Sequence, residues 1–249
     1  MDGTLWLLIG GAALAGLVQG LSGFAFAMVA MSVWVWGLEP RTAATLAIFG
    51  GLVGQVLQLF TVPRTPKLAV LGPYLLGAAA GVPLGLALLP HLDLALFKLL
   101  LGSFLVLCCP ALLLAHRLPA VHGGGRGADA LVGLAGGVMG GLGGFSGVLP
   151  TLWSTLRGYD RDLQRGVIQN FSLATLSAAL LVQFASGAVT RALLPQMAVV
   201  VVALLVPSLL GTRLYRGLDV AAFRRVVLFV LSASGLAMLG SGLAGVLGR

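Results

Sequence analysis

The stretch GGVMGGLGGFSGVLP (Gly136–Pro150) lies inside an apolar segment that runs from Ala130 to Leu156. Glycine destabilises a helix interior by about 1 kcal/mol relative to alanine. A second apolar segment, Leu5–Trp36, has a similar centre, GLSGFAF (Gly20–Phe26). As one straight helix, Leu5–Trp36 would be about 48 Å long, which is too long for a simple membrane span unless the helix is strongly tilted. We predict that each segment is broken into two half-helices. The alternative is a tilted helix whose small residues form a packing face.

The composition of the whole chain predicts a polytopic, all-α membrane protein. Apolar residues make up 59% and charged residues 9% of the 249 positions, and the mean hydropathy is +1.06. A soluble domain carries roughly a quarter charged residues. Runs of about 20 apolar residues are typical of membrane-spanning helices. The apolar segments are Leu5–Trp36, Ala43–Phe60, Leu68–Leu89, Leu94–Ala115, Ala130–Leu156, Val167–Ser186, Leu193–Leu214 and Ala221–Leu247.

The chain also contains an internal repeat. A shift of 121 residues places QGLSGF on GGLGGF, and it places Glu39 on Asp160. Further on, LDLALFK (Leu92–Lys98) matches LDVAAFR (Leu218–Arg224) at a shift of 126. Similar motifs in the same order indicate a duplication. We predict two homologous halves of four apolar segments each, residues 1–115 and 130–249, joined by a linker over residues 116–129.

The basic residues predict how the halves are oriented. If all eight segments cross the membrane, the Lys and Arg residues divide nine to six between its two sides. If the first and fifth segments are re-entrant, the division becomes eleven to four. The positive-inside rule favours the steeper division. We therefore predict re-entrant first and fifth segments, three true spans per half and inverted halves. Both termini would then lie outside a cytoplasmic (inner) membrane, with the central linker in the cytoplasm.

Several other functions are disfavoured by the sequence. The net charge of +8 comes from basic residues in short loops, with no basic patch interleaved with aromatics, so nucleic acid is not expected as a partner. We expect no metal site and no cofactor, because no Cys, His, Asp and Glu cluster has ligand spacing. GLSG and GFSG fit the Gly-x-Ser-Gly pattern of intramembrane serine proteases. The three histidines that could serve as a base, His91, His116 and His122, lie in loops or at segment ends. We predict that the protein is not an enzyme.

The glycine turns are the candidate binding site. The N-terminus of a half-helix exposes free N–H groups and the positive end of the helix dipole, which together bind anions without a buried base. Inverted repeats with broken helices are a transporter architecture. Gln55, Gln58 and Gln183 are expected to make interhelical hydrogen bonds. The candidate substrate-binding residues are Gly20, Ser22, Gly23, Phe24, Gly143, Gly144, Phe145, Ser146, Gln169, Asn170 and Ser172.

The motif GGLGGFSGVLP, followed by RGYDRDLQRGVIQN (Arg157–Asn170), resembles the TauE/SafE family of sulfite exporters, also described as sulfur-anion permeases. The resemblance covers the whole chain, although the first-half turn QGLSGF has fewer glycines than the family often has. It implies a secondary transporter, and an exporter is our prediction, of small sulfur-containing anions such as sulfite, sulfonates or thiosulfate. The lipid bilayer and a small anion are the expected partners, and a homo-oligomer is allowed. The alternatives are a non-transporting membrane subunit or chaperone, and an intramembrane hydrolase.

Overall fold

The computed structural model describes residues 2–61, 67–115, 119, 121, 123–214 and 220–247. The regular structure of these residues is helical, with no strand among them, and seven helices are long and apolar enough to span a membrane. The prediction of an all-α, polytopic protein is confirmed. The seven helices are α1 (Asp2–Ser22), α3 (Pro40–Thr61), α4 (Leu68–Leu88), α5 (Leu94–Leu114), α8 (Arg161–Ala185), α9 (Leu194–Leu214) and α10 (Val220–Leu247). The others are α2 (Phe26–Trp34), α6 (Gly125–Gly143), α7 (Val148–Leu156) and the short 3₁₀ helices η1 (Leu89–His91) and η3 (Arg191–Leu193).

Both glycine-rich segments are broken. Helix α1 ends before Gly23, with φ at 89°, and α6 ends before Gly144, with φ at 83°. This left-handed conformation ends a helix and strains any residue with a Cβ. The N–H of Gly144 donates to the Gly140 carbonyl at 2.8 Å and that of Phe145 donates to the Met139 carbonyl at 3.2 Å, as in a Schellman motif.

The turns are shorter than the glycine pattern predicts. Gly20 and Gly141 were expected in the turns, but both lie inside helices. A Cβ on Gly20 would collide with the Ser208 carbonyl of α9, and one on Gly141 would lie 2.6 Å from the Val82 carbonyl of α4. These two glycines serve close helix packing, which leaves the helical hydrogen bonds intact and moves the turns toward Gly23 and Gly144.

Each broken segment folds back on itself as a helical hairpin. The indole N–H of Trp34, at the end of α2, donates to the carbonyls of Leu7 and Leu8 near the start of α1, at 3.2 and 3.3 Å. In the second hairpin, the N–H of Val121 donates to the Leu156 carbonyl at 2.7 Å. The glycine turn therefore forms the tip of each hairpin. The other ends of its two helices come together at the opposite end of the hairpin, which we call its mouth.

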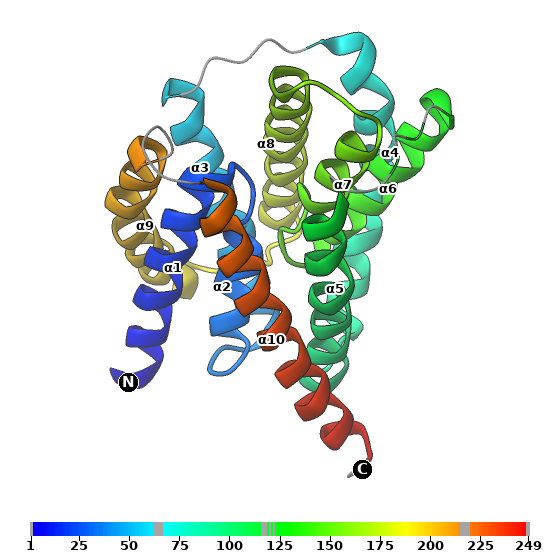
Figure 1. Ribbon diagram of the computed structural model, residues 1–249. Helices are drawn as coiled ribbons and strands as arrows, with labels where there is room; N and C mark the ends of the chain where they lie inside the picture. Colours follow the sequence, from blue (N-terminus) through cyan, green and yellow to red (C-terminus); the bar gives the residue numbers. More distant parts are fainter. Residues whose placement is uncertain are drawn as a thin grey trace.

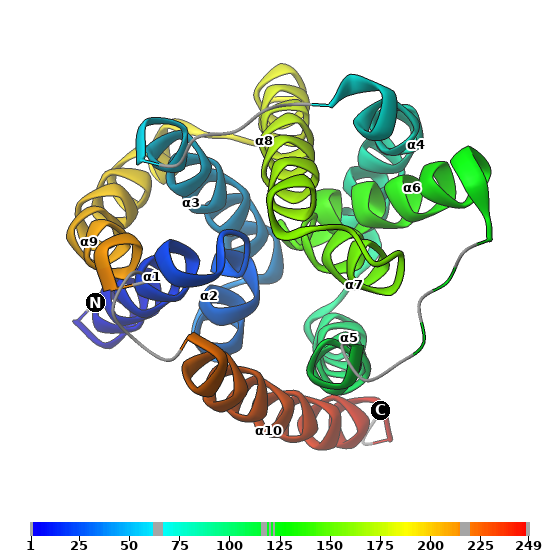
Figure 2. The ribbon, with the colours of Figure 1, turned by 45° about the horizontal axis from the view of Figure 1, so that its top comes forward.

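Six helices form three close pairs, each with one helix that precedes residue 116 and one that follows residue 124. Figure 2 shows α1 beside α9 on the left, α4 beside α6 on the right, and α5 beside α10 along the lower edge. Gly77, Gly81 and Gly85 of α4 face the backbone of α6, and a Cβ on Gly81 would meet the Leu134 carbonyl and lie 2.9 Å from the Val138 nitrogen. Glycines at every fourth position let two helix backbones approach closely in lipid.

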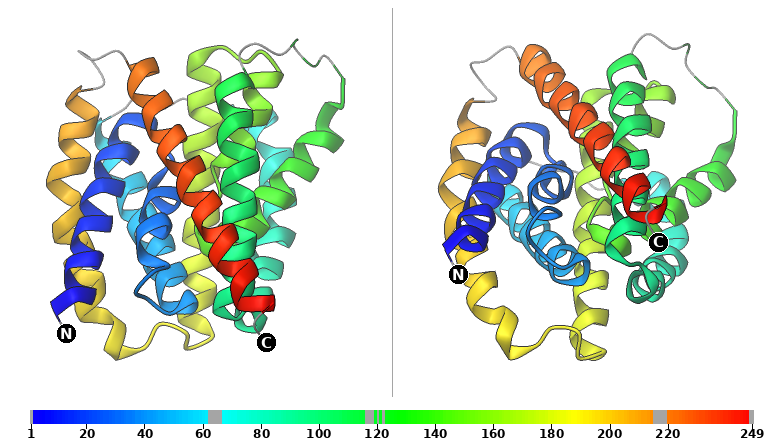
Figure 3. Two further views of the ribbon diagram at one scale, coloured as in Figure 1. Left: turned by 60° about the horizontal axis from the view of Figure 1, so that its bottom comes forward. Right: turned by 90° about the horizontal axis from the view of Figure 1, so that it is seen from below.

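The outer surface of the helices is apolar. Trp6, Phe60, Leu76, Val202 and Phe229 are among its most exposed side chains, as expected for residues that face lipid chains. Both chain termini lie at the same end of the molecule, the lower end in Figure 1 and in the left view of Figure 3. The connection between α2 and α3 lies at that end too (Figure 1), so the first hairpin begins and finishes on one side.

The α4–α6 contact predicts that an added methyl group destabilises the protein at Gly81 but not at a glycine with open space around it. Gly81→Ala should lower the thermal unfolding midpoint in detergent, because the added methyl overpacks the contact and such overpacking costs about 1–3 kcal/mol. Gly240→Ala is the matched control, since a Cβ on Gly240 in α10 meets nothing within 4 Å. Alanine is the better helix former, so this control should unfold at the same or a higher temperature. Equal midpoints for the two variants would contradict the close packing.

Candidate functional site

The tips of the two hairpins meet in the interior. A Cβ on Gly147 would lie 2.7 Å from the Cβ of Phe24, and one on Gly144 would lie 3.2 Å from the Cβ of Ala27. The N-terminal ends of the short helices α2 and α7 are therefore in direct contact. Phe26, Ala27 and Val148 in their first turns are buried. The two glycine breaks thus form one shared junction.

Helix α8 bridges this junction. Gln169 and Ser172 are three residues apart and so lie on one helix face. The amide nitrogen of Gln169 lies 3.5 Å from the position of a Cβ on Gly23, and the hydroxyl of Ser172 lies 2.9 Å from that of a Cβ on Gly147. Both side chains are 1% exposed. The structure therefore brings the predicted residues Gly23, Phe24, Gln169 and Ser172 together.

The junction is rich in hydrogen-bond donors. The first N–H groups of a helix have no partner within the helix. The hydroxyl of Ser22 accepts from the N–H groups of Phe24 and Ala25 at 3.5 and 3.3 Å. The N-cap residues are Ala25 for α2 and Gly147 for α7, and neither makes a side-chain hydrogen bond to the N–H groups of the first turn. Two positive helix-dipole ends consequently face one buried region.

Other predicted residues lie differently. The Asn170 amide donates to the Gly166 carbonyl of its own helix at 2.8 Å. The ring of Phe145 packs against Phe104 of α5, with ring centroids 5.4 Å apart. Ser146 is buried beside Gly140 of α6, whose Cβ would lie 3.2 Å from the Ser146 Cβ. Ser22 is exposed, so the junction is more accessible at the first turn than at the second.

A set of buried amides, which we call the glutamine cluster, surrounds the first turn. The Gln55 and Gln58 amides donate to the carbonyls of Gly23 and Gln19 at 2.7 and 2.9 Å. Gln19 donates to the Gly51 carbonyl at 3.0 Å, and Gln169 donates to Gln58 Oε1 at 2.8 Å. The interhelical hydrogen bonds expected of Gln55 and Gln58 are present. Gln19 directly precedes Gly20 in the repeated motif but is not among the residues predicted from the sequence.

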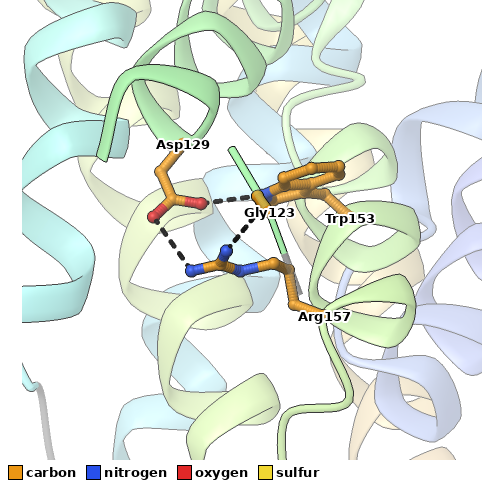
Figure 4. A network of polar contacts seen from close by, with 4 residues as sticks. All are labelled: Gly123, Asp129, Trp153 and Arg157. Atoms are coloured by element: carbon orange, nitrogen blue, oxygen red, sulfur yellow. Dashed lines mark hydrogen bonds and ion pairs between the residues drawn. The ribbon is translucent and has the colours of Figure 1, made fainter. Parts of the chain in front are cut away.

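The mouth of the second hairpin is closed by a polar network (Figure 4). The indole N–H of Trp153 donates to Asp129 Oδ1 at 2.7 Å, and a guanidinium nitrogen of Arg157 lies 3.9 Å from Asp129 Oδ2. Arg157 also donates to the Gly123 carbonyl at 2.9 Å. Among the described residues, Asp129 is the one buried charged side chain, 4% exposed. It was assigned to the linker because α6 was expected to begin at Ala130, whereas the helix begins at Gly125.

A pocket of about 690 Å³ lies at the other end of α2, between the α2–α3 and α4–α5 connections. Its lining includes Arg41 and Lys98 together with Glu39 and Asp93. Arg41 donates to the Pro90 carbonyl at 2.8 Å, and the Lys98 ammonium lies 4.5 Å from the centre of the Trp36 ring. Since α2 has nine residues, about 14 Å of helix separates this pocket from the junction.

The comparison with known protein families agrees with this architecture. The model of the family described as sulfite exporter TauE/SafE matches residues 8–238, nearly the whole chain. The protein belongs to the TauE/SafE family. Members of the TauE/SafE family are membrane transporters and not enzymes, as predicted. No curated protein and no solved structure matches the chain. Among the described residues, no group of three or more His, Cys, Asp and Glu side chains could hold a metal ion.

The network at the second mouth makes a prediction about this TauE/SafE protein. Asp129→Ala should lower the unfolding midpoint by the equivalent of about 1–3 kcal/mol, because the Trp153 indole N–H loses its acceptor. Asp129→Asn is the control, since its carbonyl oxygen can still accept from Trp153 while the ion pair with Arg157 is removed. Thermal unfolding in detergent measures both. Equal losses in the two variants would show that the ion pair, and not the Trp153 hydrogen bond, closes the mouth.

Proposed function

We propose that this TauE/SafE protein is a secondary transporter that exports small sulfur-containing anions such as sulfite, sulfonates or thiosulfate. The observation that carries the proposal is the meeting of the α2 and α7 N-termini in one buried junction. Each N-terminus presents N–H groups and about half a positive charge. Two of them facing the same region would hold an anion without any lysine or arginine.

Membership of the TauE/SafE family supports sulfur-containing anions as the substrate class. The surroundings of the junction support the binding of an anion. Among the described residues, no lysine or arginine is buried, so the junction has no fixed positive charge that would hold an anion too tightly for release. Within this proposal Gly23, Phe24, Gly144 and Ser146 shape the turns, and Ser172 and Gln169 contribute polar side-chain atoms. Gly20, Ser22, Gly143, Phe145 and Asn170 would support the site from adjacent positions.

An inverted repeat would explain why the junction forms. The helices recur in order, with α3 starting at Pro40 and α8 at Arg161, and with α5 starting at Leu94 and α10 at Val220. In such a repeat α1 would correspond to α6, and α4 to α9. The pair α1–α9 would then correspond to the pair α6–α4, and both pairs are present. In the proposed topology the two hairpins are re-entrant from opposite sides of a cytoplasmic membrane. Three spans in each half would then surround the site, with the chain termini outside.

Export needs no coupling ion in this proposal. An interior-negative potential of 100 mV contributes about 2.3 kcal/mol for each negative charge that moves outward. The pocket between the α2–α3 and α4–α5 connections lies on the side proposed to be outside, and Arg41 and Lys98 would receive the anion there. A homo-oligomer is compatible with this mechanism but is not required by it.

Flux in reconstituted liposomes tests the function. We expect the purified protein to release trapped sulfite or a small sulfonate, with an outward flux that increases when the interior is made negative. A thermal-shift series with sulfite, thiosulfate, sulfonates and small carboxylates should show stabilisation by the transported anions. Absence of flux for every small anion, together with stable co-purification of a partner, would favour the non-transporting subunit instead.

Gly144→Val tests the glycine turn. Valine is strained at a φ of 83°, and its Cβ would press on Ala27 and on the Ala47 carbonyl, so transport should fall to background. Gly147→Ala is a milder variant that adds one methyl against Phe24 without left-handed strain, and it should reduce flux severalfold. Gly10→Val in α1 is the control, because a Cβ there meets nothing within 4 Å. Wild-type flux in Gly144→Val would remove the turn from the mechanism.

A further inference from the structure

Three buried oxygen atoms, two in the glutamine cluster and one on Ser172, have no hydrogen-bond partner among the described residues. They are Gln19 Oε1, Gln169 Oε1 and Ser172 Oγ, and each of these side chains is 1% exposed. A buried polar atom without a partner costs about 1–3 kcal/mol. Buried polar atoms in proteins are almost always paired with protein, water or a ligand. The two amide oxygens therefore indicate a missing donor, and the Ser172 hydroxyl can either donate or accept.

The amide orientations cannot be reversed to supply that donor. The nitrogen of Gln19 donates to the Gly51 carbonyl, and the nitrogen of Gln58 donates to the Gln19 carbonyl. Gln58 Oε1 then accepts from the nitrogen of Gln169. Exchanging oxygen and nitrogen in any of these amides would place two oxygens against each other. The chain of hydrogen bonds therefore leaves the oxygens of Gln19 and Gln169 as acceptors.

These acceptors are complementary to the donors of the junction. Ser172 Oγ lies beside Gly147, where α7 begins, and Gln169 lies one helical turn earlier beside Gly23. Residues three apart on a helix have Cβ atoms about 5–6 Å apart. Helix N–H groups and carbonyl-type acceptors thus lie within the length of a small molecule. An anion without a hydrogen-bond donor would place lone pairs against the amide oxygens.

We propose that the glutamine cluster and Ser172 form an acceptor subsite that recognises a hydrogen-bond donor on the transported anion. This inference rests on the proposed function and narrows its substrate class. The preferred substrates are small anions with an O–H or N–H group within two or three atoms of the acidic group, such as hydroxy- or aminosulfonates. For an inorganic oxyanion the donor is its own proton, so the monoprotonated form is transported in preference to the dianion.

Matched ligands test the subsite. In liposomes, 2-hydroxyethanesulfonate and ethanesulfonate differ by one hydroxyl and carry the same charge. A site with buried acceptors rejects an analogue that lacks the donor, because its own polar groups stay unpaired. We expect 2-hydroxyethanesulfonate to be transported at least tenfold more efficiently, measured as flux at subsaturating concentration. Equal efficiencies would overturn the proposal while leaving anion transport intact, whereas no flux of either sulfonate, sulfite or thiosulfate would overturn the proposed function itself.

Variants assign the preference to named atoms. Gln169→Leu removes the acceptor and should bring the ratio of 2-hydroxyethanesulfonate flux to ethanesulfonate flux close to one. Because this change also removes the hydrogen bond to Gln58, Ser172→Ala provides a smaller perturbation that should weaken the same preference. Gln183→Leu is the matched control, since Gln183 is a buried amide of α8 with an unpaired Oε1. Gln183 lies 14 residues from Gln169, about 21 Å along the helix. Its replacement should leave the ratio of 2-hydroxyethanesulfonate flux to ethanesulfonate flux unchanged.

The alternative occupant of the acceptors is a monovalent cation, which also binds carbonyl and hydroxyl oxygens. Thermal unfolding in Na⁺, K⁺ and choline chloride, with and without each sulfonate, separates the two. Stabilisation by 2-hydroxyethanesulfonate in all three salts would support the acceptor subsite. Stabilisation by Na⁺ alone that is lost in Gln169→Leu, with no difference between the sulfonates, would assign the oxygens to a cation and overturn the proposal.

Discussion

A helix that breaks inside an apolar protein must find partners for its free backbone groups, because hydrocarbon offers none. Both breaks in this chain meet that constraint with protein groups. The Gly23 carbonyl accepts from the Gln55 amide, and the end of α6 is closed by its own Schellman hydrogen bonds. At the start of α2 the Ser22 hydroxyl accepts from two N–H groups, and at the start of α7 the Val148 N–H donates to the Phe145 carbonyl at 3.4 Å. The first N–H groups of a helix have no acceptor within the helix, and this is the physical basis of the proposed anion site.

Glycine has two separate functions in this fold. Gly23 and Gly144 adopt left-handed backbone conformations that end α1 and α6. Gly81 and Gly20, by contrast, are ordinary helical residues whose missing side chains let α4 approach α6 and let α1 approach α9. Close packing of the outer pairs holds the hairpins inside the molecule. The geometry of the turns and the contact between them therefore also depend on glycines that lie inside the helices and outside the turns.

Much of the architecture could be predicted from the sequence, because hydropathy and glycine content are local properties. The expected segment Ala43–Phe60 became α3, and Leu94–Ala115 became α5, each within three residues at either end. Both breaks were expected, and Gly23, Gln169 and Ser172 do lie together. Asp129 was missed because the residues before it are glycine-rich and polar, so the pattern gave no sign that α6 begins at Gly125. Its burial results from contact with Trp153, which is 24 positions away.

The amino-acid sequence by itself determined that this protein is an all-helical membrane protein of the TauE/SafE family with glycine breaks in its first and fifth apolar segments. These properties follow from composition and from motifs that a few consecutive residues carry. Only the tertiary structure decided that the two breaks touch, that α8 bridges them, and that Asn170 turns away toward Gly166 while Gln19 joins the cluster. Neighbouring positions on a helix point about 100° apart, so the direction of each side chain depends on how its helix is rotated against the others. That rotation is set by packing between helices that are distant in the chain.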